Sequence, residues 1–491
     1  MLRESEHGRG KPIITGEVAG KRLIAVDAHT IAWGNFKTFP DHLFHHIKNT
    51  LGLEWGAGEL AKPVPQRHPI MQWLTAVGEL WNRARETASN GLVNPPITGA
   101  VQMYLGLAYN LFLLRHDAEL VADMVTRLKS RDHYMGAFYE SFVAACFIRA
   151  GFKLALEDER DNTTDHHEFI ATHPSGRKYA VEAKSRQPGA DEPKVISKLK
   201  KALKKPTSLP RIVFVDVNLA IKPGESPELW MRQVYDEVKA SEATMYVNGE
   251  PAPPAYLIVT NHPHHYDLEG TYAPSSMIPI GFKIPDFGHN AAFRTLTDWY
   301  KAKRKKHGDV EEVIESMADY KIPSTFDGSI PEFTYGAAER KWIIGETYDL
   351  SDYEKGASGV LTTAVVMEAD RKAWLGFHLV DGRAILGQMP LNDAELAAYG
   401  RSPHTFFGVP MKVGKTIENA FQWFEFFVDS FKDLKREQAL KFFAKNHRLE
   451  FLKTLSDEDL LYAYCESHTM AAMRRSIKRF PSTSADPKRP Q

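Results

Sequence analysis

Apolar residues recur at intervals of three and four along much of the first 128 residues, which is typical of amphipathic helices. The clearest cases are residues 71–88 (MQWLTAVGELWNRARETA) and 97–129 (ITGAVQMYLGLAYNLFLLRHDAELVADMVTRLK). Residues 12–33 alternate instead and are rich in β-forming side chains, so they predict one or two short strands. We therefore expect residues 1–128 to form a mostly helical region that begins with short strands.

A different pattern begins near residue 131 and predicts an α/β domain. Residues 134–151 (YMGAFYESFVAACFIRAG) predict a helix that ends at Gly151, and FKLALE predicts the strand after it. Residues 167–184 (HEFIATHPSGRKYAVEAK) predict a hairpin that turns at Pro174-Ser175-Gly176. Further elements are predicted as helices over 192–205 and 227–241 and as strands over 211–221, 255–263 and 278–284. The resulting order, α-β-β-β-α-β-α-β, indicates a compact α/β domain with a mixed sheet.

The rest of the chain predicts a less specific architecture. Residues 291–340 predict a connector of helix and loop, and residues 341–480 predict an α+β region in which strands precede helices. The tail, 481–491, is polar and rich in proline, and we expect it to be disordered. At roughly 150 residues per domain, 491 residues suggest two to four units. The predicted α/β core then spans residues 129–290.

Composition is that of a globular protein in a reducing compartment. Hydrophobic residues make up 43% of the chain, enough for a sizeable core. The two cysteines, Cys146 and Cys465, lie far apart and predict buried thiols, with no disulfide framework or zinc spacing. The segment MLRESEHGRGKP lacks the apolar stretch of a signal peptide, and the longest apolar run, Met103 to Leu114, is shorter than the about 20 residues a membrane helix needs. We expect a cytoplasmic protein with no membrane partner.

The tripeptide Glu182-Ala183-Lys184 carries the strongest chemical signal. On a strand, Glu182 and Lys184 point to the same face. Such a carboxylate binds a divalent cation that activates water, and the lysine orients that water or steadies the charge developing on phosphorus. The alternative is that these two side chains, with Lys178, form the solvated face of a half-exposed strand.

A divalent cation such as Mg²⁺ needs further oxygen ligands. Asp165 and Glu168 precede the apolar run Phe169-Ile170-Ala171 on the first strand of the hairpin, which folds back toward Glu182. The register stays open, because a slip of one residue moves every side chain to the other face. The greater frequency of aspartate in such sites slightly favours Asp165, whereas the position at the start of the strand favours Glu168.

Glu140 is a third acid of interest, on the helix before the first strand. Its neighbours Phe138, Phe142 and Val143 belong to the apolar stripe, so Glu140 borders the buried face, where a charge needs compensation. A role as a metal ligand supplies that compensation. The alternative is a boundary residue that pairs with a nearby arginine or lysine.

Taken together, the segments GAFYESFVAACFIRAGFKLAL and DHHEFIATHPSGRKYAVEAKSR resemble the PD-(D/E)xK, restriction-endonuclease-like superfamily over about residues 131–262. The resemblance implies an α-β-β-β-α-β core with a Mg²⁺ or Mn²⁺ site at the central hairpin. It matches Glu140 to the helix glutamate, Asp165 or Glu168 to the acid of the first hairpin strand, and Glu182 and Lys184 to the E and K of the motif. No Pro-Asp pair is present, which is the departure from the family pattern.

A lysine-rich helix follows the tripeptide, with Lys198, Lys201 and Lys205 among its basic residues. They are candidates for phosphate contacts, and the alternative is a solvated amphipathic helix. The formal net charge of the chain is zero, so binding to nucleic acid would depend on such local patches.

The segment His262-Pro263-His264-His265 follows a predicted strand. Histidines this close suggest a zinc or manganese site, although adjacent residues point apart, and a polar loop is the alternative. The segment could also line a cleft at the end of a strand, where α/β sheets often bind ligands.

The sequence therefore predicts a metal-dependent nuclease acting on nucleic acid, with DNA favoured over RNA. One alternative is a catalytically inactive protein of the nuclease fold that binds nucleic acid or a protein partner, since members of the superfamily sometimes lose catalysis and keep binding. Another is a metal hydrolase that uses the histidine segment 262–265. The oligomeric state is open.

Overall fold

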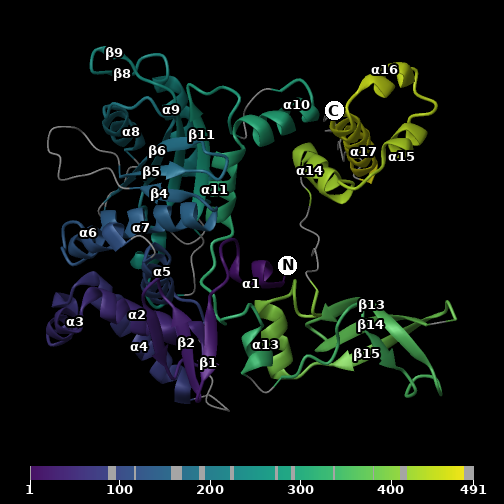
Figure 1. The fold of residues 1–491 in the computed structure, drawn as a ribbon, viewed down its shortest axis with the longest axis horizontal. Coiled ribbons are helices and arrows are strands. Elements are labelled where there is room, and N and C mark those ends of the chain that lie inside the picture. The colour runs from purple at the N-terminus through teal and green to yellow at the C-terminus, as the bar shows by residue number, and fades with distance from the viewer. Residues whose placement is uncertain are drawn as a thin grey trace, which may run out of the picture. The chain divides into compact units, whose positions relative to one another are not determined.

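The computed structural model describes residues 2–86, 96–115, 118–155, 168–186, 189, 194–221, 226–270, 275–288, 293–335, 338–379, 381–409, 417 and 419–479. Within these residues the protein is a mixed α/β structure with several sheets, as predicted (Figure 1). It divides into two compact units, Met1–Ile284 with Glu312–Val413 and Pro285–Glu311 with Gly414–Gln491. The predicted segmentation differs, because the connector 291–340 and the region 341–480 each contribute to both units. The tail predicted to be disordered, 481–491, lies outside the described residues.

The N-terminal part of the first unit is mostly helical after a small sheet, which agrees with the pattern. Three short strands pair antiparallel, one more than expected: β1 (Thr15–Val18), β2 (Lys21–Ala25) and β3 (Ile31–Gly34). The helices are α1 (Leu2–His7), α2 (Phe39–Leu51), α3 (Leu53–Leu60), α4 (Pro69–Glu86), α5 (Gly99–Leu114) and α6 (Ala118–Leu128), with a 3-10 turn at Val64–Gln66. Helix α5 is buried along almost its whole length, so it is the centre of this part.

A six-stranded mixed sheet of order β11-β10-β7-β6-β5-β4 forms the core of the first unit (Figure 1). Its strands are β4 (Lys153–Ala155), β5 (Phe169–Thr172), β6 (Lys178–Ser185), β7 (Arg211–Asp216), β10 (Ala255–Asn261) and β11 (Ser276–Phe282). β4, β5 and β6 form an antiparallel meander, β6, β7 and β10 run parallel, and β11 returns antiparallel. With α7 (Tyr134–Arg149), α8 (Val195–Leu203) and α9 (Glu228–Ser241), the predicted order of elements is confirmed. The small hairpin β8 (Tyr246–Val247) and β9 (Glu250–Pro251) was not predicted.

Helices cover both faces of this sheet. On one face, Phe147 of α7 contacts Phe169 of β5 and Phe214 of β7. Side chains alternate along a strand, so Val213 and Val215 point to the other face, where they share a buried core with α8 and α9. Burial on both faces explains the almost continuous apolar run of β7, which is typical of parallel strands.

Helix α7 is closed by Gly151 at the C′ position, two residues after its last helical residue Arg149, as the sequence predicted. Gly151 has φ of +89°, in the left-handed region that glycine adopts without a steric penalty. The amide of Phe152 then donates to the carbonyl oxygen of Phe147 at 3.0 Å, which satisfies one of the last free carbonyls of the helix. The chain passes from here directly into β4, so the turn fixes the start of the sheet relative to α7.

A second sheet of the first unit is a four-stranded antiparallel meander. Its strands are β12 (Thr347–Asp349), β13 (Ser358–Met367), β14 (Lys372–Leu379) and β15 (Ala384–Pro390), in sequence order. Helix α13 (Asp393–Arg401), which was not predicted, packs against this sheet through Ala398 in a shared apolar core. The short α12 (Pro331–Thr334) precedes the meander.

The second unit is helical in its described residues. It contains α10 (Leu296–Lys301), a π-helical turn (Ala302–Lys306), α14 (Ala420–Ser430), α15 (Arg436–Phe442), α16 (Leu449–Thr454) and α17 (Asp457–Arg479). Tyr300 of α10 packs against Phe424 of α14 and Tyr462 of α17, so the two segments of the unit share one core. Helix α11 (Gly308–Ala318) contains the boundary between the units. No helix in the described ranges is both long and apolar enough to cross a membrane.

The N-terminus of α5 lies unusually close to the loop that follows β10. The amide of Ala100 donates to the carbonyl oxygen of Leu268 at 3.1 Å. A Cβ atom at Gly99 would lie 2.2 Å from the carbonyl oxygen of His264 and 2.1 Å from that of Asp267. Only glycine fits at this contact, which ties the helical region to the histidine segment.

We expect Gly99→Ala to destabilise the first unit, because the added methyl group cannot be placed unless the loop backbone moves. Overpacking of this kind costs about 1–3 kcal/mol, which urea unfolding followed by circular dichroism would register as a lower midpoint. Gly106→Ala on the same helix is the matched control, since a Cβ there meets no atom within 4 Å. Alanine is a better helix former than glycine by up to about 1 kcal/mol, so the urea midpoint of Gly106→Ala should equal or exceed that of the wild type. Equal midpoints for Gly99→Ala and Gly106→Ala would contradict the close contact at Gly99.

Candidate functional site

Strand β6 places Glu182 and Lys184 on the same face, as predicted, but Glu182 is not solvated. Only 2% of its side chain is exposed. The ammonium of Lys184 lies 2.8 Å from Glu182 Oε2, and that of Lys205, just after α8, lies 2.7 Å from Glu182 Oε1. Both carboxylate oxygens therefore face a cation, which is what keeping a buried charge requires.

Glu168 lies beside this pair at the start of β5. Its amide donates to the carbonyl oxygen of Val181 at 3.2 Å, which sets it next to Glu182 across the hairpin. Lys184 Nζ donates to Glu168 Oε1 at 2.5 Å, so one ammonium holds two carboxylates from neighbouring strands. Asp165, the other candidate for the strand acid, lies outside the described residues.

Helix α7 brings Glu140 to the same cluster. Glu140 is buried, and its carboxylate pairs with Arg127 near the end of α6 at 2.6 Å. The sequence predicted its position at the border of the buried face but did not identify Arg127. Burial, reinforced by the nearby charge of Glu168, raises the pKa of Glu140 to about 8 despite the contact with Arg127.

The cluster combines three acidic and three basic side chains from neighbouring elements. They are Arg127, Glu140, Glu168, Lys184, Glu182 and Lys205. Three carboxylates on three elements supply the oxygen donors that Mg²⁺ and Mn²⁺ prefer, so the chemistry of the donor set fits such a metal. In this structure the carboxylates face cationic side chains, and among the described residues no group of three or more His, Cys, Asp and Glu converges on one point.

The three lysines expected to contact phosphate lie in different environments. Lys201 is exposed on α8. Lys198 Nζ donates to the carbonyl oxygen of Ser185 at 2.8 Å, next to the tripeptide. Lys205 faces Glu182, as described above. Of these three lysines, Lys201 is therefore the one that is available on the surface, whereas Lys198 and Lys205 contact residues of β6.

The histidine segment forms a short 3-10 turn, Pro263–Tyr266, whose imidazoles face different partners. His262 Nδ1 lies 3.0 Å from Asp216 Oδ1, and His264 Nε2 lies 2.9 Å from Ser275 Oγ. The ring of His265 contacts that of Tyr266, with centroids 4.1 Å apart. Adjacent residues of a tight turn point apart, so these side chains share no common point for a metal in the part of the chain that is described.

Asp216 is a buried residue that the sequence did not single out. It ends β7, and Oδ1 accepts from the hydroxyl of Thr260 at 3.0 Å as well as facing His262. The hydroxyl of Tyr139, beside Glu140 on α7, lies 2.8 Å from that of Thr260. The signal that could have located Asp216 is its place at the carboxyl end of a parallel strand, where α/β sheets bind ligands.

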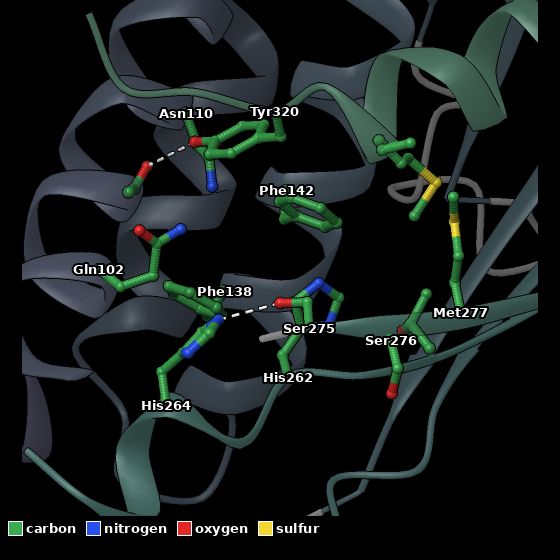
Figure 2. Close-up of a pocket in the computed structure, with 14 residues that line it drawn as sticks. Gln102, Asn110, Phe138, Phe142, His262, His264, Ser275, Ser276, Met277 and Tyr320 are labelled. Carbon is green, nitrogen blue, oxygen red and sulfur yellow. Dashed lines mark hydrogen bonds between the residues drawn. The ribbon is translucent and has the colours of Figure 1, made fainter. Parts of the chain in front are cut away.

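A cavity of about 140 Å³ adjoins this network (Figure 2). Its walls come from α5, α7, the end of β10 with the histidine turn, the start of β11 and the end of α11. His262 and Thr260 line this cavity, so the two side chains that contact Asp216 Oδ1 also form part of the cavity wall. The sequence pointed to a ligand site at the histidine segment but not to the helices that enclose it.

Comparison of the chain with models of protein families, with curated proteins and with solved structures gives no match.

The raised pKa of Glu140 predicts how stability changes with pH. Between pH 4.5 and about 8 the folded protein keeps a proton that the unfolded chain has released, so stability falls as pH rises through this window. Glu140→Gln cannot titrate, and we expect the wild type to lose stability relative to this variant across the same window. Unfolding midpoints at several pH values would measure the difference.

Glu368→Gln is the matched control, because Glu368 is exposed in a turn of the second sheet. Its stability should follow that of the wild type at every pH. If the wild type instead gained stability relative to Glu140→Gln as pH rises, Arg127 would lower the pKa of Glu140 by more than burial raises it.

Proposed function

We propose that this chain is a metal-dependent nuclease that hydrolyses phosphodiester bonds of nucleic acid, DNA rather than RNA. The observation that carries the proposal is the position of Lys184, whose ammonium is held between Glu168 and Glu182 on two neighbouring strands. A buried acid–lysine arrangement at a hairpin is costly to fold and gains nothing that an apolar pair would not supply. Its place among further acids points to chemistry.

The order of elements supports the same proposal. From α7 through β4, β5, β6, α8 and β7, the chain follows the α-β-β-β-α-β order of the restriction-endonuclease-like core. β4, β5 and β6 pair antiparallel, β6 and β7 pair parallel, and the candidate acids lie on the central hairpin and on the helix before it. This likeness is one of arrangement, and the proposed core adopts it over residues 134–216.

Each residue of the cluster has a proposed role. Glu140, Glu168 and Glu182 would hold Mg²⁺ or Mn²⁺, with Asp165 as the alternative acid on the strand. When bound, such an ion polarises the phosphate and lowers the pKa of a coordinated water. Burial lowers the pKa of Lys184, but the carboxylates of Glu168 and Glu182 outweigh it and raise the pKa overall. Lys184 therefore stays an ammonium, which can orient water and steady negative charge on phosphorus.

A second candidate function is binding of nucleic acid without cleavage. It is favoured by the charge balance of the cluster, because Lys184 and Lys205 already compensate Glu168 and Glu182, and Glu140 keeps its proton below a pH of about 8. A site whose charges are satisfied by the protein has less need of a metal ion. The two functions separate in one assay, because only the nuclease requires the divalent cation for a change in its substrate.

We expect the purified protein to cut plasmid or linear DNA in the presence of Mn²⁺ or Mg²⁺ and not in EDTA. Lys184→Ala and Glu182→Gln should each reduce the cleavage rate by at least about 100-fold, the usual effect of removing a group that stabilises transition-state charge. Gel assays with matched protein concentrations measure the rates.

Lys178→Ala is the matched control, since Lys178 is exposed at the start of the same strand. Its activity should stay near that of the wild type. DNA binding by the wild type with no cleavage in either metal would favour the binding function, and equal rates in the wild type and Lys184→Ala would exclude this cluster as the active site.

The exposed face of α8 is expected to contact phosphates. Lys201→Ala should weaken DNA binding equally for unrelated sequences and reduce the slope of log K against log salt by about 1. Fluorescence anisotropy at several salt concentrations measures both. Lys355 is exposed on a loop between β12 and β13, so Lys355→Ala should have the same salt slope as the wild type. If Lys201→Ala also had the slope of the wild type, α8 would not be part of the interface.

A further inference from the structure

The cavity beside the Asp216 network has unused hydrogen-bonding groups. The carboxamide of Gln102 makes no hydrogen bond to any described residue. His262 uses Nδ1 for Asp216, which leaves Nε2 available (Figure 2). The amide of Gln102 and the imidazole of His262 together present both donors and acceptors to a ligand.

Aromatic rings enclose the same space. Phe138 and Phe142 lie one turn apart on α7, and Tyr320 follows α11 (Figure 2). The ring centroid of Phe142 lies 4.6 Å from that of His262 and 5.1 Å from that of Tyr320. The hydroxyl of Tyr320 donates to Asn110 Oδ1 at 2.7 Å, which fixes this ring against α5. The aromatic rings thus lie beside polar groups from α5 and from the end of β10.

The lining carries no fixed charge. None of the described residues that line the cavity is Asp, Glu, Lys or Arg. Burial lowers the pKa of His264 to about 3, so this imidazole stays neutral. A phosphate or a carboxylate would find no lysine or arginine in this lining, and a cationic ligand would find no aspartate or glutamate. The cavity therefore suits a neutral molecule.

The volume of the cavity also limits the size of the ligand. The volume of about 140 Å³ is below the range of about 300–1,000 Å³ of sites for drug-sized ligands. A single planar heterocycle with donors and acceptors along one edge matches the volume, the aromatic side chains and the neutral polar groups. We propose that this cavity binds a nucleobase that packs against the aromatic side chains and is read by Gln102 and His262.

This inference rests on the proposed function in taking nucleic acid as the substrate, and it deepens that function by giving the protein a pocket for an unpaired base. The same chemistry could come from a base turned out of a strand or from a free nucleoside. The hydrogen bonds favour a link to the cluster. Ser185 Oγ, directly after Lys184, lies 3.5 Å from Asp216 Oδ2, and Asp216 in turn holds His262 at the cavity.

Binding measured in EDTA tests the pocket independently of cleavage. The probes are a DNA duplex with one bulged nucleotide, the same duplex with an abasic residue at the bulge, and the four free deoxynucleosides. We expect the duplex with the bulged base to bind the wild type about tenfold more tightly than the abasic duplex, a gain typical of one stacked base. Gln102→Ala and His262→Ala should abolish this preference.

Gln233→Ala is the control, because Gln233 lies on α9 and is exposed. It should keep the preference for the base. Gln102→Ala removes no hydrogen bond within the described chain, so it remains informative if His262→Ala does not fold. Saturable binding of a nucleoside by calorimetry, lost in Gln102→Ala and with no preference between the duplexes, would support the pocket and identify a free nucleoside as its ligand. Equal binding of the two duplexes together with no binding of any nucleoside would overturn the proposal, whatever the cleavage assay shows.

Discussion

A carboxylate that is almost completely buried must be compensated, and the arrangement of the first unit around Glu182 follows from this constraint. One compensating lysine, Lys184, comes from the same strand. The other, Lys205, comes from the end of the crossover that carries α8, so an ion pair fixes this crossover in addition to its apolar packing. Lys184 also pairs with Glu168 on the next strand, and the charge of Glu168 contributes to the raised pKa of Glu140 on α7. The hairpin, the crossover and the helix are therefore interdependent, and the same interdependence brings together the groups proposed for catalysis.

Much of this arrangement was accessible from the sequence, because it depends on local patterns. The apolar runs gave the order of elements in the core, and Gly151 gave the end of α7. The alternation along β6 gave the shared face of Glu182 and Lys184, whose burial decided against a solvated strand. The partners from distant segments were not accessible. Arg127 at Glu140 and Lys205 at Glu182 depend on how helices pack against the sheet, and no local pattern encodes that packing.

The histidine segment shows the same limit in another form. Its spacing suggested a metal or a ligand, and the sequence could not decide which side chain would face which neighbour. In the structure the tight turn separates the imidazoles, and Asp216 and Ser275 engage one each. The cavity next to them is built by α5 and α7, which lie far away in the sequence. The close contact of Gly99 with this turn shows how α5 comes near enough to form a wall. Long-range packing thus creates the site, while the local sequence only marks one of its edges.

The division of the chain into two interleaved units has a consequence for biosynthesis. The second unit combines the segment Pro285–Glu311 with the C-terminal segment from Gly414 onward. Tyr300 packs against Phe424 and Tyr462, so during translation the first of these aromatic rings leaves the ribosome more than a hundred residues before its partners exist. Until then its apolar surface is open to solvent or to a chaperone. The first unit, by contrast, has all of its segments once Val413 has emerged, so the core that carries the acid cluster can fold while the helical unit is still incomplete.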